Sequence, residues 1–409
     1  MIPPLLRENR EFRRLFVGQA VSLFGDQVAV IALPLTAVLA LHAGAAQMGY
    51  LMTTTLAPNL LFAMHAGALV DRLGRRRHAM LLADGARALL TATIPIAYAF
   101  GHLTFVQLYV VGFLIGTFGV VFNVASGALF GLIVEREDYV AGSSLLNGSR
   151  AFSYMAGPSA GGVLVQVLRG PYALFADALS FVWSAVFLGR MQVDEPPVDD
   201  KSRGVLSGAR WLARSRVMRA DLAATATINY FNFLFFALFI LFATKSLHVH
   251  PAVLGLVLGA GAVGGLIGSF ITGRVTRRIG IGPAFTLGCF LFPAPLLLVP
   301  AARGPMWVVL LCLFGSEFGA GFGVMILDIS GAAITASHVP QSMRARVAGA
   351  FTVVNYGVRP LGTITAGILG STIGLRPTLW IATIGALAGV LWLLPSPVPR
   401  LRELPAAPE

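Results

Sequence analysis

Ionisable side chains lie inside long apolar stretches of this sequence, where they could bind and release protons. Asp26, Glu317 and Arg359 each lie near the middle of such a stretch, Glu317 among closely spaced glycines (GSEFGAGFG), and Arg150 lies in a further one. An ionised group inside a membrane is costly unless it faces a partner or a water-filled cavity. An apolar environment favours the neutral form of a carboxyl group, which lets that group exchange protons near neutral pH. We therefore expect Asp26 and Glu317 to couple protons, with Arg359 or Arg150 as the counter-charge.

Structural roles are the alternative for several of these residues. Asp26 could form a fixed hydrogen bond between helices, and Arg359 could be the static partner of an acidic residue. Asp84 and Arg87 are three positions apart in the chain, which places them on one face of a helix, and we expect a structural pair there. Asp177 lies toward the outer end of its apolar stretch, so it could simply reach water.

The elements that must hold these residues are membrane-spanning helices. The chain has 409 residues, of which 56% are apolar and 12% charged, and its mean hydropathy is +0.78. Soluble proteins contain about 25% charged residues, so this composition predicts a polytopic membrane protein and excludes a cytosolic enzyme, a secreted disulfide scaffold and a disordered chain. A helix needs about 20 apolar residues to cross a bilayer. By that measure the sequence predicts twelve spans, near residues 13–41, 48–70, 79–100, 105–130, 142–168, 171–190, 221–243, 251–272, 284–301, 305–330, 347–373 and 377–395.

The predicted spans form two sets of six. The longest polar stretch separates the sets, so we expect an N-terminal six-helix bundle over 1–190, a cytoplasmic linker over 191–220, and a C-terminal six-helix bundle with a short cytoplasmic tail over 221–409. Most of the 30 Lys and Arg residues fall in loops on the side that holds both termini. The positive-inside rule then places both termini in the cytoplasm. This topology also accounts for the formal net charge of +12 without any nucleic-acid partner.

A short motif repeats at the same place in each half. GALVDRLG over residues 67–74 follows the second span, and GRVTRRIG over residues 273–280 follows the eighth. The same separation relates Asp26 to Asn232. Duplicated halves are typical of transporters, whose sites lie between the two repeats. The sequence therefore predicts an all-α polytopic membrane protein, with twelve transmembrane helices in two six-helix bundles related by pseudo-two-fold symmetry.

Several segments resemble those of a known family. GALVDRLGRRR over residues 67–77 resembles, at every fixed position, the signature that the major facilitator superfamily carries between its second and third spans. SYMAGPSAGG over residues 153–162 resembles the span-5 motif of antiporters in that family, except that Ser153 replaces the first glycine. LFGDQVAVIALP over residues 23–34 resembles the exporter subgroup that includes enterobactin and macrolide efflux proteins. The resemblance covers the whole chain.

This resemblance implies which helices line a transport pathway. In the family fold, spans 1, 4, 7 and 10 surround the central cavity. Those spans here contain acidic or amide side chains, namely Asp26, Asn123, Asn229, Asn232 and Glu317. We therefore expect a polar-lined pathway. Many proton-coupled relatives carry an arginine in span 4, whereas this span has no charged residue, so Arg150 is the nearest substitute in role.

The signature between spans 2 and 3 is expected to act as a gating loop. In the family it resembles a latch against the cytoplasmic end of span 11, where Arg344 and Arg346 are the expected partners of Asp71. Glu135, Glu137 and Asp138 could in turn accept the arginines of the signature. The alternative is that these arginines only enforce topology. The expected members of the gating loop are Gly67, Asp71, Arg72, Gly74, Arg75 and Arg76.

The antiporter-like motif in span 5 implies a direction of transport. Proline removes a backbone donor and small residues allow close helix approach, so this motif favours a kinked, thin helix. Its key members are Gly157, Pro158, Gly161 and Gly162. In the family, the motif accompanies export in exchange for protons.

The sequence as a whole predicts a secondary active exporter in the cell membrane. It would move a small amphipathic or apolar molecule, such as a drug, a secondary metabolite or a siderophore-like compound, outward by proton antiport and alternating access. A nucleotide-binding GxxxxGK[ST] loop is absent from the sequence, which argues against ATP hydrolysis as the energy source. The alternatives are a nutrient importer or uniporter of the same fold and, less favoured, a polytopic membrane enzyme or receptor. Because the seven histidines are scattered, we expect no enzyme activity, metal or cofactor. We also expect a monomer in the lipid bilayer.

Overall fold

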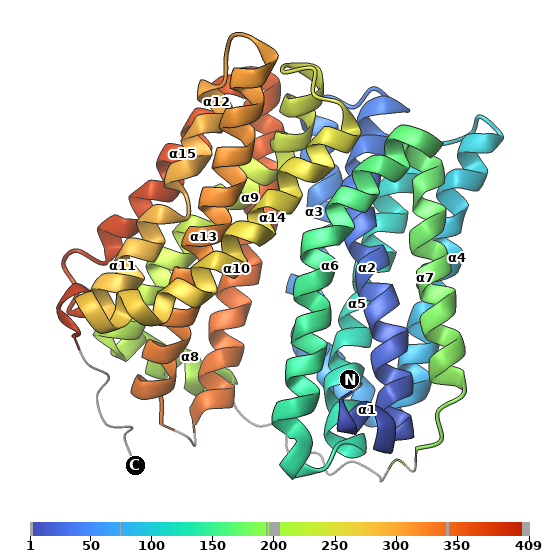
Figure 1. The fold of residues 1–409 in the computed structure, drawn as a ribbon, viewed down its shortest axis with the longest axis horizontal. Coiled ribbons are helices and arrows are strands. Elements are labelled where there is room, and N and C mark those ends of the chain that lie inside the picture. Colours follow the sequence, from blue (N-terminus) through green and yellow to red (C-terminus); the bar gives the residue numbers. More distant parts are fainter. Residues whose placement is uncertain (1–2, 74, 194, 196–204, 341–342, 403–409) are drawn as a thin grey trace. The chain divides into compact units, whose positions relative to one another are not determined.

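In a computed structural model the chain folds into helices, and no strands occur among the described residues (Figure 1). The structure describes residues 3–73, 75–193, 195, 205–340 and 343–402, without the side chains of 63–73, 205–208 and 345.

The first half contains six long helices. A short helix, α1 (Pro4–Glu8), precedes them, and the 3-10 turn η1 (Arg136–Asp138) lies between the fourth and the fifth. Asn9 separates α1 from the first long helix because its side-chain oxygen accepts the Phe12 amide at 2.8 Å, as an N-cap does. The six helices are α2 (Arg10–Leu39), α3 (Ala45–Leu73), α4 (Arg76–Ala99), α5 (Phe105–Ile133), α6 (Tyr139–Leu168) and α7 (Gly170–Gly189).

The second half repeats this pattern after a short amphipathic helix, α8 (Val205–Arg214). One span is broken into α11 (Ile281–Leu291), η2 (Ala294–Leu297) and α12 (Leu298–Ala301), because Pro293 and Pro295 cannot continue the helical hydrogen-bond pattern. The other segments are α9 (Arg216–Lys245), α10 (Pro251–Ile279), α13 (Met306–His338), α14 (Arg344–Thr372), and α15 (Leu375–Ala388) with η4 (Gly389–Trp392); the turn η5 (Val398–Arg400) follows.

The long helices have the dimensions of membrane spans. Within the described part of the chain, nine of them combine sufficient length with sufficient mean hydropathy. The other three, α3, α6 and α14, are 29, 30 and 29 residues long but carry more polar and small residues. The predicted all-α polytopic membrane fold with twelve spans is confirmed.

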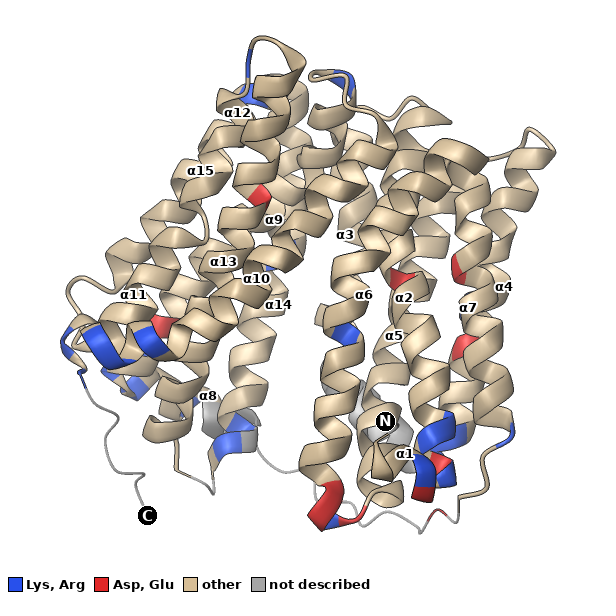
Figure 2. Cartoon of the chain, in the orientation of Figure 1, with Lys and Arg blue, Asp and Glu red and all other residues tan. Residues whose placement is uncertain are grey.

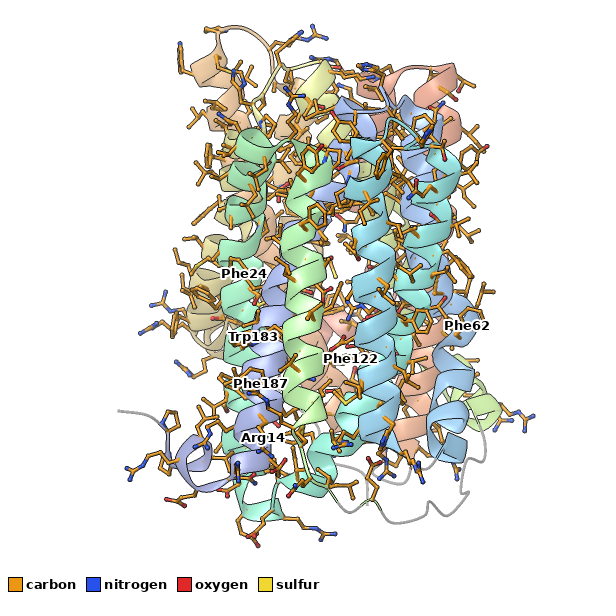
Figure 3. The ribbon with its side chains drawn as sticks, turned by 90° about the vertical axis from the view of Figure 1, so that its right-hand side faces the viewer. Arg14, Phe24, Phe62, Phe122, Trp183 and Phe187 are labelled. Carbon is orange, nitrogen blue, oxygen red and sulfur yellow. The ribbon has the colours of Figure 1, made fainter. Side chains whose placement is uncertain are left out.

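The residues that face outward are those expected of a protein surrounded by lipid. Leu82 and Leu89 on α4 and Trp183 on α7 are largely exposed although they are apolar. Trp183 and Phe187 lie side by side on α7, with ring centroids 5.0 Å apart (Figure 3). Charged residues gather instead at helix ends within each unit, and few lie in helix interiors (Figure 2).

The chain divides into two compact units, each with its own buried cores. The first comprises residues 1–43, 54–202 and 250–256, and the second comprises 44–53, 203–249 and 257–409. Leu15, Met80 and Phe122 belong to a core of the first unit, and Ile228 and Phe285 belong to a core of the second.

The first turns of α3 belong to the second unit, and the first turns of α10 belong to the first unit. These two helices occupy equivalent places in the two halves of the chain. Glycines make both arrangements possible. A Cβ at Gly49 of α3 would lie 2.7 Å from the Cα of Gly367 on α14. A Cβ at Gly255 of α10 would lie 3.1 Å from the Cα of Gly162 on α6. Only glycine permits such close backbone approach.

The segment expected as a linker, 191–220, contains helical structure. Leu212 of α8 is buried against Met218, Val339 and Val347. The helix α9 begins at Arg216, before the apolar run itself, because the Ser215 hydroxyl accepts the Met218 amide at 3.3 Å and caps the helix.

Candidate functional site

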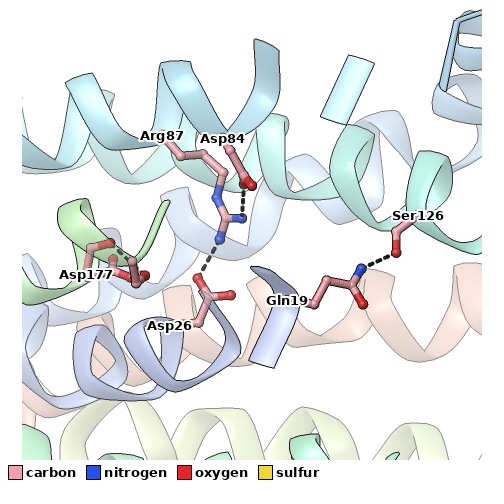
Figure 4. Close-up of polar contacts among 7 residues, drawn as sticks. Gln19, Asp26, Asp84, Arg87, Ser126 and Asp177 are labelled. Carbon is pink, nitrogen blue, oxygen red and sulfur yellow. Dashed lines mark hydrogen bonds and ion pairs between the residues drawn. The ribbon is translucent and has the colours of Figure 1, made fainter. Parts of the chain in front are cut away.

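An ion pair inside the first unit joins α2 to α4. Arg87 Nη2 donates to Asp26 Oδ1 at 2.5 Å, and Arg87 Nη1 contacts Asp84 Oδ1 at 3.4 Å (Figure 4). The side chains of Arg87 and Asp84 are 7% and 0% exposed, whereas that of Asp26 is 34% exposed. One guanidinium therefore serves two carboxyl groups, and Asp26 is the one that also reaches open space.

Asp177 on α7 adds a third carboxyl group to this cluster. Its Oδ1 lies 2.9 Å from the position that a Cβ would take at Gly25, the residue before Asp26. Ser180 Oγ donates to the backbone oxygen of Asp177 at 2.7 Å (Figure 4). The expectation that Asp177 reaches water is wrong, because the residue is 2% exposed and packs against α2. Three carboxyl groups around one arginine become electrically neutral only when two of them are protonated.

The guanidinium of Arg87 is held by aromatic rings. It lies 3.8 Å from the ring centroid of Phe181 on α7 and 5.8 Å from that of Phe122 on α5. Such stacking stabilises a cation that is removed from water. Its Nε atom is buried and has no hydrogen-bond partner among the described residues. Arg87 is therefore fixed by packing, and the pairing of its charge depends on Asp26 and Asp84.

Asp26 faces a small polar cavity. The cavity has a volume of about 40 Å³, and Asp26, Arg87, Asn123 and Arg150 are among the residues that line it. A cavity needs about 10–15 Å³ to hold a water molecule, so this one admits water but not a drug-sized molecule. The structure thus brings together three residues that the sequence singled out, Asp26, Asn123 and Arg150. In place of the two arginines that we expected, Arg87 forms the ion pair with Asp26.

In the second unit, Glu317 and Arg359 have separate surroundings. Glu317 lies half-buried on α13, and its Oε2 is 3.5 Å from the position of a Cβ at Gly261 on α10. Among the described residues, Glu317 forms no ion pair. The guanidinium of Arg359 lies 4.0 Å from the ring centroid of Tyr356 and 4.8 Å from that of Phe233. The carboxyl group of Glu317 thus lies beside the backbone of α10, and aromatic rings hold Arg359.

Comparison with known proteins identifies the family. The model of the Major Facilitator Superfamily matches residues 15–363. The chain belongs to this superfamily. The resemblance seen in its sequence motifs is confirmed.

Several individual proteins are similar to this chain at 27–28% identity. The multidrug efflux pump Tap of Mycobacterium tuberculosis (strain ATCC 25618 / H37Rv) is 28% identical over 410 residues, covering 94% of this chain and 92% of the pump. Tap of Mycolicibacterium fortuitum is 28% identical over 378 residues, covering 86% of each chain. The class C tetracycline resistance protein of Escherichia coli is 27% identical over 292 residues, covering 70% of this chain and 69% of that protein.

Solved structures of transporters share the fold. The nucleoside transporter NupG superposes with a TM-score of 0.73 at 12% identity, covering 94% of this chain and 99% of NupG. A bacterial homologue of the iron transporter ferroportin, in its inward-facing state, superposes with a TM-score of 0.68 at 15% identity, covering 94% and 98% of the two chains.

The antiporter-like motif of this superfamily member lies at close helix contacts within the first unit. A Cβ at Gly157 would lie 2.3 Å from the Cβ of Gln27, and one at Gly161 would lie 2.9 Å from the oxygen of Val28, both on α2. A Cβ at Gly162 would lie 2.4 Å from the backbone oxygen of Pro251 on α10. Each glycine thus allows α6 to touch a neighbouring backbone or side chain that alanine would displace. Pro158 lies inside the same helix.

Part of the loop that we expect to act in gating lies outside the described residues. This applies to Gly74 and to the side-chain surroundings of Gly67, Asp71 and Arg72, so their expected pairing with Arg344 and Arg346 stays a prediction. Arg344 Nη2 donates to the backbone oxygen of Ala336 at 2.9 Å, near the end of α13.

The backbone amides of Arg76 and Arg77 have an acceptor that the sequence did not indicate. The carboxylate of Glu195 accepts the backbone amides of Arg76 and of Arg77, the latter at 2.9 Å, so it stabilises the first turn of α4. Arg75 is exposed. Within the described residues, no ion pair joins Arg75, Arg76 or Arg77 to the acidic residues between α5 and α6.

The amide residues expected along span 7 differ in their surroundings. Asn229 Nδ2 donates to Asn355 Oδ1 on α14 at 2.9 Å and to the backbone oxygen of Thr225 at 3.0 Å. These bonds join α9 to α14, so Asn229 has a structural role. Asn232 lies half-buried on α9.

Sequence reasoning missed the central role of Arg87. Its spacing from Asp84 indicates a local pair, and that contact is the longer of its two ion pairs. The depth of each charged residue in the membrane could have indicated that Arg87 has partners beyond Asp84. Counted from the helix ends on the side of the termini, Arg87 and Asp177 lie at similar depths in α4 and α7.

Proposed function

We propose that this chain is a proton-driven exporter of small apolar or amphipathic molecules. The observation that carries the proposal is the Asp26–Arg87 ion pair, at a cavity that admits water, inside a member of the major facilitator superfamily. The similarity to multidrug efflux pumps over most of the chain supports export as the direction. The similarity to a tetracycline resistance protein supports a small organic cargo.

In the proposed mechanism, proton binding to Asp26 breaks its ion pair with Arg87. The ionised carboxylate ties α2 to α4, and the neutral carboxyl group loses the charge attraction that holds it at 2.5 Å. Arg87 stays on its aromatic rings and keeps its contact with Asp84 at 3.4 Å. The contact between α2 and α4 thus has two states, and the proton selects between them. Glu317 is the second proposed proton-binding group, in the other unit.

The proposed orientation follows the basic loops. Both termini lie in the cytoplasm, because most of the Lys and Arg residues fall on their side of the predicted topology. In this orientation, Asn123, Arg150 and Asn232 contribute to the polar pathway and Arg359 supplies a charge in the second unit. The gating loop and the antiporter-like motif bias the states that exchange during transport.

Transport by inverted membrane vesicles tests this proposal. Vesicles that contain the chain are given a panel of fluorescent or radiolabelled drugs, including a tetracycline, with an imposed proton gradient. We expect accumulation that stops when an ionophore collapses the gradient. Accumulation that persists unchanged after the collapse would refute proton antiport.

Two neutral variants assign the coupling group. Asp26→Asn and Glu317→Gln each remove one proton-binding site with little change of shape, and Glu8→Gln, on the exposed surface of α1, serves as the control. We expect Asp26→Asn to abolish gradient-driven accumulation while Glu8→Gln retains it. Unchanged pH dependence of transport in both Asp26→Asn and Glu317→Gln would exclude these carboxyl groups as the coupling site.

A further inference from the structure

A second cavity lies entirely within the second unit, among α9, α11, α13 and α14. Its volume is about 440 Å³, within the range of about 300–1,000 Å³ that is usual for small-molecule sites. Most of its wall is apolar, with Leu327 and Val339 as examples, and it includes the aromatic rings of Phe285 and Phe351. Two carboxyl groups, those of Asp221 and Asp328, interrupt this apolar wall.

Asp221 lines the cavity, and none of the described residues forms a salt bridge with it. The residue is 2% exposed and lies on the second turn of α9. Thr225 donates to the backbone oxygen of Asp221, and among the described residues no donor or cation bonds to the carboxyl group itself. A buried carboxylate that lacks a partner is costly. A cation inside the cavity would remove that cost.

Two other charged side chains line the cavity. Asp328 on α13 is one of them, and among the described residues it forms no salt bridge. Arg344 also lines the cavity, and its guanidinium donates to the backbone oxygens of Ala336 and, through Nε at 3.4 Å, of Val339. Among the described residues, no salt bridge pairs the carboxyl group of Asp221 or that of Asp328, so the cavity offers two carboxyl groups to a ligand, and Asp221 is the more deeply buried.

The chemistry of the wall distinguishes between kinds of cation. A metal ion takes several oxygen, nitrogen or sulfur ligands, and no group of three such acidic, histidine or cysteine side chains is found among the described residues. Aromatic rings and apolar side chains instead suit an organic cation, through cation–π attraction and burial of apolar surface.

We propose that this cavity binds a lipophilic organic cation, with Asp221 as the counter-charge and Phe285 and Phe351 as aromatic walls. The proposal rests on the proposed export function and names a cargo class for it. The cavity selects amphipathic cations over neutral molecules of equal size and excludes anions.

Equilibrium binding to the purified full-length chain in detergent tests this proposal. The probes are ethidium, a planar organic cation, and N-phenyl-1-naphthylamine, a neutral apolar fluorophore, each followed by fluorescence. We expect Asp221→Asn to weaken ethidium binding by about tenfold or more, because removing one partner of a buried charge pair has at least that effect. Binding of the neutral probe changes less than twofold, and Glu8→Gln leaves both unchanged.

A second variant keeps the test decisive if Asp221→Asn does not fold. Ala332 lines the cavity and is itself exposed, so Ala332→Phe fills space in the cavity while the Asp221 side chain is kept. We expect it to weaken the binding of ethidium. Unchanged ethidium binding in either folded variant would overturn the proposal, as would an equal loss of both probes in Asp221→Asn, which would indicate a structural role.

Binding requires no proton gradient, so the two proposals fail separately. Ethidium binding that depends on Asp221, in a chain whose transport ignores the gradient, would refute proton antiport alone. Gradient-driven transport of neutral compounds, in a chain that does not bind ethidium at this cavity, would refute the cation site alone.

Discussion

The ion pair between Asp26 and Arg87, which joins two helices, should stabilise the first unit more than an ion pair of similar length within one helix. A double-mutant cycle with Asp26→Asn, Arg87→Gln and the double variant isolates the interaction between the two side chains. Breaking a buried ion pair costs about 3–5 kcal/mol. Asp26 is 34% exposed at a cavity that admits water, so we expect a coupling energy of about 2 kcal/mol, below that range.

The pair of Glu11 and Arg14 provides a matched control. Its atoms are 2.7 Å apart, close to the 2.5 Å of the buried pair, but it is an i,i+3 pair near the start of α2. Such pairs on helices contribute about 0.2–0.5 kcal/mol. Both pairs are partly buried and similar in length. The contrast between the two cycles therefore measures what an ion pair between two helices adds over a local pair within one helix.

Reversible unfolding of the purified chain in detergent, by titration with SDS and detection of tryptophan fluorescence, measures both cycles. A coupling energy for Asp26 and Arg87 that is no larger than that of the control pair would refute the reasoning. In that case the charge pair would already be screened by water, and protonation of Asp26 would not change the contact between α2 and α4.

Three further predictions concern helix contacts. Gly162→Ala should lower stability by about 1–3 kcal/mol and slow transport, because its Cβ would lie 2.4 Å from the backbone oxygen of Pro251. The control, Gly148→Ala on the same helix, meets nothing within 4 Å and should be neutral. Equal melting temperatures of the two variants would contradict this prediction. Asn229→Ala should lower stability by about 0.6 kcal/mol, the average for hydrogen bonds between membrane helices, and leave the affinity for cargo unchanged. A large change of affinity with an unaltered melting temperature would show that Asn229 acts in the transport pathway instead. Glu195→Gln should lower stability by up to about 1 kcal/mol, and this loss of stability should shrink in high salt. A loss of stability that does not depend on salt would exclude an electrostatic effect at the start of α4.

The span count could be predicted because bilayer thickness imposes a length on every crossing helix. The span predicted over residues 13–41 lies within α2 except at its end, and the run interrupted by Pro293 and Pro295 still crosses as α11, η2 and α12. The ends of the helices were less predictable, because they depend on local capping. The hydroxyl of Ser215 and the amide side chain of Asn9 begin helices outside the apolar runs.

The partners of the polar residues could not be predicted in the same way. Asp26 and Arg87 are 61 positions apart in the chain, and their contact depends on which faces of α2 and α4 point toward each other where both helices pack against α7. Asn229 shows the same limit, because its partner Asn355 lies 126 positions away on α14. Asp221 lies at the start of a predicted span and carries no sequence signal of the cavity beside it.

The sequence by itself determined that this chain crosses a membrane many times, that its halves are repeated, and that it belongs to the major facilitator superfamily, because hydropathy and motifs are properties of consecutive residues. The tertiary structure alone decided that Arg87 pairs with Asp26, that Asp177 is buried, and that Asp221 faces an apolar cavity. Each step along a helix turns the side chain by about 100°, so a small rotation of one helix against another changes every contact without changing the hydropathy of either.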